Sequence, residues 1–470
     1  MSELVWASAT ELARLYRSGE VSPTDVVDAV LDRLQTVEPS INAFVTVTDD
    51  LARKQAKDAE QRIRSGDDLP PLCGIPITVK DLVDTAGIRT TYGCKSMAAN
   101  VPEQDSVSWH RLKQAGAILI GKTTTPEYGM LGVTESHLTG TTSTPWDPSR
   151  TSGGSSGGAA AAAAAGVAPL ALGSDGGGSI RVPAACCGVV GVKPSSGRIP
   201  IRGNTEPDHT EGPLTRTVAD AALMLSILVG PHHEDRLSLP ATGEHYLERV
   251  AHAPAMSELR IAYSADLGQG PIDPQTRTTI EHALAAAEQA GAVVDPVELT
   301  LPDTIDYFVA YWCPEAPGAM DDVHKPAGDT WPLMEELADR ARKLSAAEAS
   351  RAMRGLKTEI YNEFDRVLQT YDVIITPTTP VPAFPHAGDK GGVDEVDGQP
   401  VRMPGLYFHR LTEPPSHAGL PAVSIPAGFT RGGLPVGMQL IGRQHADGDV
   451  LAVAAAFEAL TPWRHRRPLV

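Results

Sequence analysis

The chain has 470 residues, with 40 Lys plus Arg against 58 Asp plus Glu and a formal net charge of −18. This acidity argues against nucleic acid as a partner, because binding a polyanion starts from a basic surface. At 41% hydrophobic and 21% charged residues, the composition is that of a globular protein with a large core. Disordered and fibrous classes are excluded.

Targeting and metal-binding signals are missing from the sequence. The apolar stretch 159–172 is too short to span a bilayer and is interrupted by Gly166 and Pro169. No basic region followed by an apolar run opens the chain, so no secretory signal is expected. Five cysteines, without CxxC or ligand-like spacing, indicate reduced thiols. We expect a cytoplasmic protein with no membrane association and no metal centre.

Two helices are predicted at the start of the chain. Ser8 and Glu11 have the spacing of a capping box, and Ser22 followed by Pro23 opens the second helix. Short apolar runs then alternate with helical segments, which is typical of buried strands in an α/β sheet. Strands are expected at 75–79, 117–120, 169–172, 189–192, 260–263, 293–297, 373–376, 422–425 and 436–441, and further helices at 217–229, 275–290, 346–369 and 449–460.

The pattern shows no internal repeat and no low-complexity linker, so we expect one α/β domain over residues 1–470. Two segments differ from the rest. Residues 380–418 are rich in Pro and Gly with little periodicity, and residues 302–345 concentrate the aromatic side chains Tyr307, Phe308, Tyr311, Trp312 and Trp331. Long irregular segments in compact domains are usually functional, so both are expected to be pocket walls or lids. Ordinary core packing is the alternative for the aromatic residues.

Glycine and serine are concentrated in one block. Eleven of the 44 glycines lie between Gly153 and Gly191. A flexible linker does not fit, because apolar strand-like and helix-like segments lie between and after the two clusters. A phosphate-binding loop is poorly supported, since the block has no GxxxxGK[ST] and no GxGxxG followed by the expected acidic residue.

Three successive glycines directly precede Ser179. Without side chains, the backbone N–H groups of Gly176, Gly177 and Gly178 can turn toward one point beside the Ser179 hydroxyl. An oxyanion hole next to a nucleophile requires this arrangement. The sequence therefore predicts Ser179 as a nucleophile.

A nucleophilic serine needs a base at neutral pH, and Lys80 is the candidate. Of the 14 histidines only His137 lies near the glycine block, whereas Lys80 ends a predicted apolar strand. Burial favours an uncharged amine and so lowers the pKa of a lysine into a useful range. A solvated lysine paired with Asp81 is the structural alternative.

Taken together, these motifs resemble the amidase signature family of serine hydrolases. Lys80 within Val-Lys-Asp is followed 75 residues later by Ser155 in Gly-Gly-Ser-Ser-Gly-Gly, and 24 residues further by Ser179 in Gly-Gly-Ser-Ile-Arg-Val-Pro-Ala. The flanking segments 121–123, 145–147, 191–194, 212–216 and 434–439 agree with it. The resemblance covers nearly the whole chain.

The resemblance implies a single large mixed β-sheet covered by helices on both faces, and a Ser-cisSer-Lys triad. Ser179 would attack the carbonyl carbon, Ser155, after a cis peptide bond to Gly154, would relay the proton, and Lys80 would be the general base. Further roles implied are oxyanion donors at Gly176, Gly177 and Gly178, bracing of the two loops by Ser156, Asp175 and Arg181, and substrate binding by Tyr128 and Gly129 within the segment 126–131.

One departure from the family is Gly176, where many members carry Thr, Ile or Gln. The N–H group is kept, so the oxyanion hole is retained with a roomier entrance. The resemblance predicts a cofactor-free amidase that cleaves carbon–nitrogen bonds of small amides through an acyl-enzyme on Ser179. Aryl amides, carbamates (urethanes) and esters are the expected substrate classes, and we expect a monomer or homodimer.

Three alternatives stay open. The segment 153–157 satisfies GxSxG, the nucleophile elbow of α/β-hydrolases, with Ser155 as nucleophile. The chain also resembles the amidase-like subunit of a tRNA-dependent amidotransferase, which hydrolyses glutamine inside a complex. An inactive amidase fold used as a scaffold is the third alternative, although all three triad positions are filled.

Overall fold

A computed structural model describes residues 3–66, 68–203, 208–305, 332–388 and 391–470. The aromatic residues named above for the segment 302–345 lie outside the described residues. Within the described ranges, no helix is long and apolar enough to cross a membrane.

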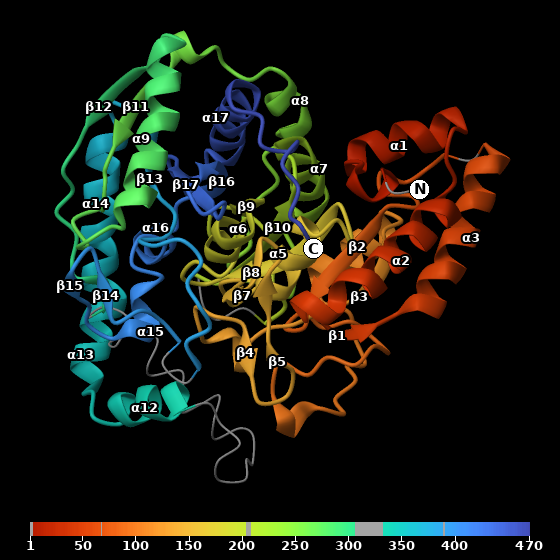
Figure 1. Ribbon diagram of the computed structural model, residues 1–470, viewed down its shortest axis with the longest axis horizontal. Helices are drawn as coiled ribbons and strands as arrows, with labels where there is room; N and C mark the ends of the chain where they lie inside the picture. Colours follow the sequence, from red (N-terminus) through yellow and green to blue (C-terminus); the bar gives the residue numbers. More distant parts are fainter. Residues whose placement is uncertain (1–2, 67, 204–207, 306–331, 389–390) are drawn as a thin grey trace.

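An 11-stranded mixed sheet organises the structure, in the order β1-β3-β2-β8-β10-β9-β16-β17-β13-β11-β12. Figure 1 shows it running from the N-terminal strands to the green strands β11 and β12 at the opposite end. Its strands are β1 (Phe44–Val47), β2 (Pro76–Lys80), β3 (Ile118–Thr123), β8 (Leu170–Asp175), β9 (Val190–Lys193), β10 (Thr210–Thr215), β11 (Arg260–Tyr263), β12 (Val293–Pro296), β13 (Val373–Pro377), β16 (Ala422–Phe429) and β17 (Pro435–Ile441). The predicted mixed α/β fold is confirmed.

Helices cover both faces of this sheet. Helices α5 and α6 contact each other and the central strands, while α7 and α17 contact each other and the same part of the sheet. The helices are α1 (Ala9–Ser18), α2 (Pro23–Ile41), α3 (Asp49–Ser65), α4 (Val107–Gln114), α5 (Gly157–Ala164), α6 (Arg181–Cys187), α7 (Val218–Leu228), α8 (Tyr246–Ala251), α9 (Pro274–Gln289), α12 (Pro332–Ala341), α13 (Ala346–Arg351), α14 (Lys357–Leu368), α15 (Pro404–Tyr407), α16 (Glu413–His417) and α17 (Asp447–Leu460). The predicted capping box of Ser8 and Glu11 is present, and α2 begins with a further one formed by Ser22 and Asp25.

Small residues let α5 lie in the middle of the protein. All eight of its residues are buried, and its sequence is Gly-Gly followed by six alanines. A Cβ on Gly158 would lie 2.3 Å from the Thr124 hydroxyl and 2.6 Å from the Ala43 carbonyl oxygen. A helix that is buried all round needs this kind of surface, because its backbone approaches its neighbours on every side. The glycine–serine block is thus part of the core.

Strands β1 and β10 were not predicted from the sequence. β10 reads Thr-Glu-Gly-Pro-Leu-Thr, and proline argues against a central strand because it lacks an N–H group. Only Leu214 and Thr215 of β10 pair with β9, so Pro213 lies beyond that ladder. The predicted helix 346–369 is also divided, because a π-helical turn over Ala352–Leu356 separates α13 from α14.

The irregular segment 380–418 is described except for residues 389–390. It contains the short hairpin of β14 (Glu395–Val396) and β15 (Gln399–Pro400), followed by α15 and α16. Every residue from Gly405 to Ala418 is buried. This end of the segment therefore packs inside the molecule, next to the glycine–serine block.

Candidate active site

Lys80 is the last residue of β2, and its side chain is fully buried. Its Nζ donates hydrogen bonds to Ser155 Oγ at 2.7 Å and to Ser174 Oγ at 3.0 Å. Burial lowers the pKa of Lys80 to about 7, although the carboxylates of Asp175 and Glu211 act in the opposite direction. A neutral amine is therefore abundant at neutral pH.

The alternative of a solvated Lys80 paired with Asp81 is wrong. Asp81 turns to the other side of the strand, where it accepts a hydrogen bond from the Thr91 N–H at 2.9 Å. Its other carboxylate oxygen lies 3.9 Å from Lys122 Nζ. The alternation of side chains along a strand places these neighbours on opposite faces.

Ser155 follows the expected cis peptide bond after Gly154. Glycine is required before it, because a Cβ on Gly154 would lie 2.6 Å from the backbone of Val133. The predicted substrate residue Gly129 is also here, since a Cβ on it would lie 3.1 Å from Ser155 Oγ. Tyr128 stacks on Tyr92, with ring centroids 6.4 Å apart.

Ser179 lies just beyond the end of β8 and is 8% exposed. Its carbonyl oxygen accepts a hydrogen bond from the Ser156 N–H at 3.1 Å, which joins the two serine-containing loops. Within the described ranges the Ser179 hydroxyl has no hydrogen-bond partner, so the structure shows the Lys80–Ser155 contact and no Ser155–Ser179 contact. Hydrogen bonds of this kind often tighten only when substrate is bound.

A row of free backbone donors precedes the Ser179 side chain. The N–H groups of Gly176, Gly177, Gly178 and Ser179 donate to no other group in the part of the chain that the structure describes. Gly178 has φ of +142°, a conformation that favours glycine. Unpaired buried N–H groups are rare in proteins. This row is therefore free to bind a developing negative charge on an oxygen.

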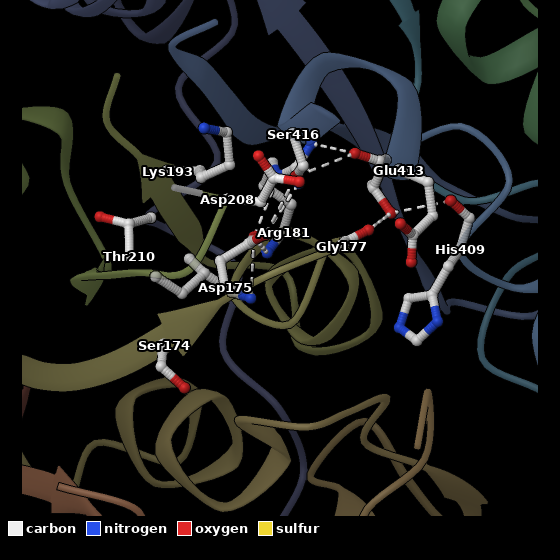
Figure 2. A network of polar contacts seen from close by, with 12 residues as sticks. Ser174, Asp175, Gly177, Arg181, Lys193, Asp208, Thr210, His409, Glu413 and Ser416 are labelled. Carbon is white, nitrogen blue, oxygen red and sulfur yellow. Dashed lines mark hydrogen bonds and ion pairs between the residues drawn. The ribbon is translucent and has the colours of Figure 1, made fainter. Parts of the chain in front are cut away.

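Asp175 and Arg181 brace this loop, as Figure 2 shows. Arg181 is fully buried and donates to the two carboxylate oxygens of Asp175 at 2.8 and 3.0 Å. Burial raises the pKa of Asp175, but the charges of Arg181 and Lys193 outweigh it and bring the pKa to about 2. A buried ion pair is stable only with such complete hydrogen bonding.

Ser156 ties the loop of Ser155 to β8. Its hydroxyl donates to the Ser174 carbonyl oxygen at 3.1 Å and accepts from the Ser174 N–H at 3.2 Å. The predicted bracing residues Ser156, Asp175 and Arg181 are thus brought together with the predicted triad loops. The ring of Tyr128, the other predicted substrate residue, stacks on that of Tyr92.

Several residues of the site were missed by sequence reasoning. The remaining donors of Arg181 reach the Thr412 carbonyl oxygen at 2.8 Å, Gln439 Oε1 at 2.6 Å and Ser416 Oγ at 2.6 Å. Gln439 lies in the recognised motif 434–439, which was a usable signal. The other two come from the segment 380–418, which carries no motif, and the same holds for the Glu413 carboxylate.

Glu413 and His417 continue the polar network on the far side of the glycine loop. A Cβ on Gly177 would lie 1.9 Å from Glu413 Oε1, so this carboxylate rests directly on the loop. The His417 ring lies between Glu413 Oε2 at 2.5 Å and Asp208 Oδ2 at 2.9 Å. Burial opposes a charged imidazole, but hydrogen bonds to these two carboxylates outweigh it and raise the pKa of His417.

Fold and site together suit acyl transfer: a mixed sheet brings a buried lysine to a serine hydroxyl, beside a row of free N–H groups. Within the described ranges, no group of three or more His, Cys, Asp or Glu side chains is placed to hold a metal ion. The Amidase family model matches residues 25–451, and the chain belongs to the amidase signature family. It is a hydrolase of carbon–nitrogen bonds, and the α/β-hydrolase interpretation of 153–157 is wrong.

Similar proteins cover nearly the whole chain. An acylamidase of Rhodococcus erythropolis is 37% identical over 471 residues, which are 99% of this chain and 98% of the relative. The glutamyl-tRNA(Gln) amidotransferase A-subunit of Carboxydothermus hydrogenoformans is 36% identical over 498 residues, with 99% of each chain covered. The crystal structure of a bacterial aryl acylamidase superposes with a TM-score of 0.90 at 30% identity, over 98% of this chain and 97% of that one.

Proposed function

We propose that the chain is a stand-alone serine amidohydrolase that cleaves small amides, aryl amides among them, through an acyl-enzyme on Ser179. The observation that carries the proposal is the 2.7 Å hydrogen bond from Lys80 Nζ to Ser155 Oγ, made by a lysine whose pKa burial lowers to about 7. The likeness to an acylamidase and an aryl acylamidase supports the choice of substrate.

The mechanism follows from the placement of these groups. As Ser179 Oγ attacks the carbonyl carbon, its proton passes to Ser155, whose own proton passes to the neutral amine of Lys80. The N–H groups of residues 176–179 bind the oxyanion that forms. The carbon–nitrogen bond then breaks, and the leaving amine takes the proton back through Ser155. Water attacks the acyl-enzyme with the same groups as base, which releases the acid and restores Ser179.

Substitution and labelling test these roles. We expect Ser179→Ala to abolish turnover of an aryl amide, and Ser155→Ala or Lys80→Ala to lower kcat/KM by several orders of magnitude. Ser174→Ala is the matched control, because Ser174 also contacts Lys80 but lies outside the relay, and it should cost far less. A fluorophosphonate should attach to Ser179. Attachment to Ser155, or near-normal rates in a triad variant, would contradict the assignment.

A second candidate function is favoured by the nearly equal identity to the amidotransferase chain. In that case the protein would hydrolyse glutamine and pass ammonia to a partner. The segments 123–128 and 175–178 look more like those of stand-alone amidases. The purified single chain decides between the two: turnover of simple anilides without preference for glutamine supports the amidohydrolase, and glutamine hydrolysis only with added partners supports the other.

Wider properties belong to the same proposal. Carbamates and esters of similar shape are further substrates, because the attack is on a carbonyl carbon. Residues 1–470 form one domain, since a single sheet takes strands from Phe44 to Ile441. The described part of segment 380–418 shapes its entrance. The protein acts as a monomer or homodimer in the cytoplasm, in keeping with free, buried thiols at Cys73, Cys94, Cys186 and Cys187.

A further inference from the structure

His409 is a buried imidazole that the mechanism above does not use. It lies between α15 and α16 and is 6% exposed. Neither of its ring nitrogens has a hydrogen-bond partner of ordinary geometry in the part of the chain that the structure describes. Buried polar side chains are nearly always paired, because an unpaired one costs free energy. The Gly154 carbonyl lies close to the ring but outside ordinary hydrogen-bond geometry. A buried ring without a well-formed hydrogen bond at either nitrogen therefore indicates a site that a ligand completes.

The ring lies against the row of free N–H groups. A Cβ on Gly178 would lie 3.3 Å from His409 Cδ2, and a Cβ on Gly132 would lie 2.9 Å from His409 Cε1. In Figure 2 the imidazole lies below the Glu413 carboxylate and away from the Asp175–Arg181 pair. Because Gly178 immediately precedes Ser179, an imidazole packed against it stands next to a carbonyl bound there.

The position also tells which part of the substrate the ring meets. The leaving amine must approach Ser155, which returns its proton, and Gly129 packs against that hydroxyl. His409 packs against Gly178 and Gly132, and its ring also lies near the Gly154 carbonyl. The contact with Gly178 places the ring on the side of the oxyanion donors, where the acyl part of the substrate binds.

The ring is expected to be neutral when substrate binds. Burial lowers the pKa of His409 and the Arg181 guanidinium acts in the same direction, while the carboxylates of Glu413 and Asp175 and the nearby Gly154 carbonyl oppose them. A neutral imidazole offers one N–H donor and one acceptor nitrogen. Its N–H is suited to donate to an uncharged oxygen. A charged substrate group, such as a carboxylate or an ammonium group, would need a protein group of opposite charge, which a neutral imidazole does not supply.

We propose that His409 binds an uncharged oxygen in the acyl part of the substrate, close to the scissile carbonyl, and so favours acyl groups such as the alkoxycarbonyl group of carbamates. This inference rests on the proposed amidohydrolase function and deepens it. A hydrogen bond of this kind typically changes affinity by about five- to tenfold.

Matched substrates that share one leaving group isolate this contact. Methyl N-(4-nitrophenyl)carbamate and 4-nitropropionanilide differ only by an oxygen in place of a methylene next to the carbonyl. The 4-nitroanilides of methoxyacetic and butyric acids make the same exchange one bond further out. For each pair we take the ratio of the two kcat/KM values and compare this ratio between variants. The intrinsic reactivity of the two substrates is the same for every variant and therefore cancels.

The variants are His409→Leu, which removes both polar atoms, and His409→Gln, which keeps a donor and an acceptor. In His409→Leu we expect the ratio of oxygen-bearing to methylene substrate to fall about five- to tenfold for at least one pair, and His409→Gln to restore most of it. An equal fall for both members of each pair would show a purely structural role and overturn the proposal, as would unchanged ratios.

Binding without turnover separates this proposal from the proposed function. In a Ser179→Ala background, calorimetry with the same four compounds should show tighter binding of the oxygen-bearing member of at least one pair. The double variant Ser179→Ala, His409→Leu should lose this preference. Equal preference in the single and double variants overturns the role of His409 even if serine chemistry is confirmed. A retained preference together with full turnover in Ser179→Ala would instead overturn the acyl-enzyme.

Discussion

Lowering the pH below 7 should reduce kcat/KM, because it protonates the amine of Lys80. With a pKa of about 7, roughly half of the lysine is neutral at pH 7 and about one tenth at pH 6. A lysine with its ordinary pKa of 10.5 would be neutral in only about one molecule in 3,000 at pH 7. We therefore expect kcat/KM to rise about tenfold per pH unit up to pH 7 and to level off above about pH 8.

The assay is the release of 4-nitroaniline from an anilide between pH 5 and pH 10, analysed as kcat/KM because this reports the free enzyme. Glu211 could give a similar acid limb in the pH profile, because burial raises the pKa of its carboxyl to about 7. Glu211→Gln distinguishes them: removing a charge that raises the pKa of Lys80 should move the acid limb to lower pH. A limb that vanishes in Glu211→Gln, or in any single histidine variant, would refute the assignment of Lys80.

Stability gives an independent measure of the same lysine. The fall in pKa from 10.5 to about 7 corresponds to a penalty on the folded state on the order of 5 kcal/mol at pH 7 and below. The penalty declines as the pH rises toward 10.5, where the unfolded chain also loses the proton. Lys80→Met removes it but also removes hydrogen bonds to Ser155 and Ser174, worth about 1 kcal/mol each.

We therefore expect Lys80→Met to be inactive yet more stable than the parent chain by a few kcal/mol at pH 7. Its advantage in thermal unfolding should shrink steadily between pH 7 and pH 10. A less stable variant whose difference from the parent chain does not depend on pH would show that the lysine is charged in the folded protein.

Two further changes test the support of the glycine loop. Arg181→Met leaves the Asp175 carboxylate buried without its main partner. The free energy of unfolding should therefore fall by about 3–5 kcal/mol at pH 7. The loss should be smaller at pH 4, where Asp175 can take up a proton and become neutral, and thermal melts at the two pH values measure the difference. Gly177→Ala places a methyl group 1.9 Å from Glu413 Oε1, so kcat should fall more than tenfold with little change in KM in steady-state kinetics. A normal kcat would mean that Glu413 moves away freely.

The placement of the site residues was largely predictable because they belong to short, specific motifs. Lys80 and Ser155 meet as expected, and the bracing roles of Ser156 and Asp175 follow from motif residues close in the sequence. The family resemblance also predicted the large mixed sheet and the helices on both of its faces. Strand β10 escaped prediction because Gly212 and Pro213 disfavour a strand, and only pairing with β8 shows that they form one.

The supporting residues from the second half of the chain were not predictable. Thr412, Glu413 and Ser416 lie in a segment without hydrophobic periodicity, where α16 is only five residues long. Their contacts with Arg181 and the glycine loop join residues more than 230 positions apart. No local pattern encodes such a contact, because it depends on how β16 and β17 close the sheet against β9. His409 belongs to the same group.

The long reach of Arg181 has a consequence for synthesis of the protein. Lys80, Ser155 and Ser179 are synthesised well before Gln439, which accepts a hydrogen bond from Arg181 at 2.6 Å and follows it by 258 residues. A nascent chain therefore carries its reactive groups long before their supports exist. Activity should begin only when β17 has emerged, so a truncated product would be unable to cut amides while it is still incomplete.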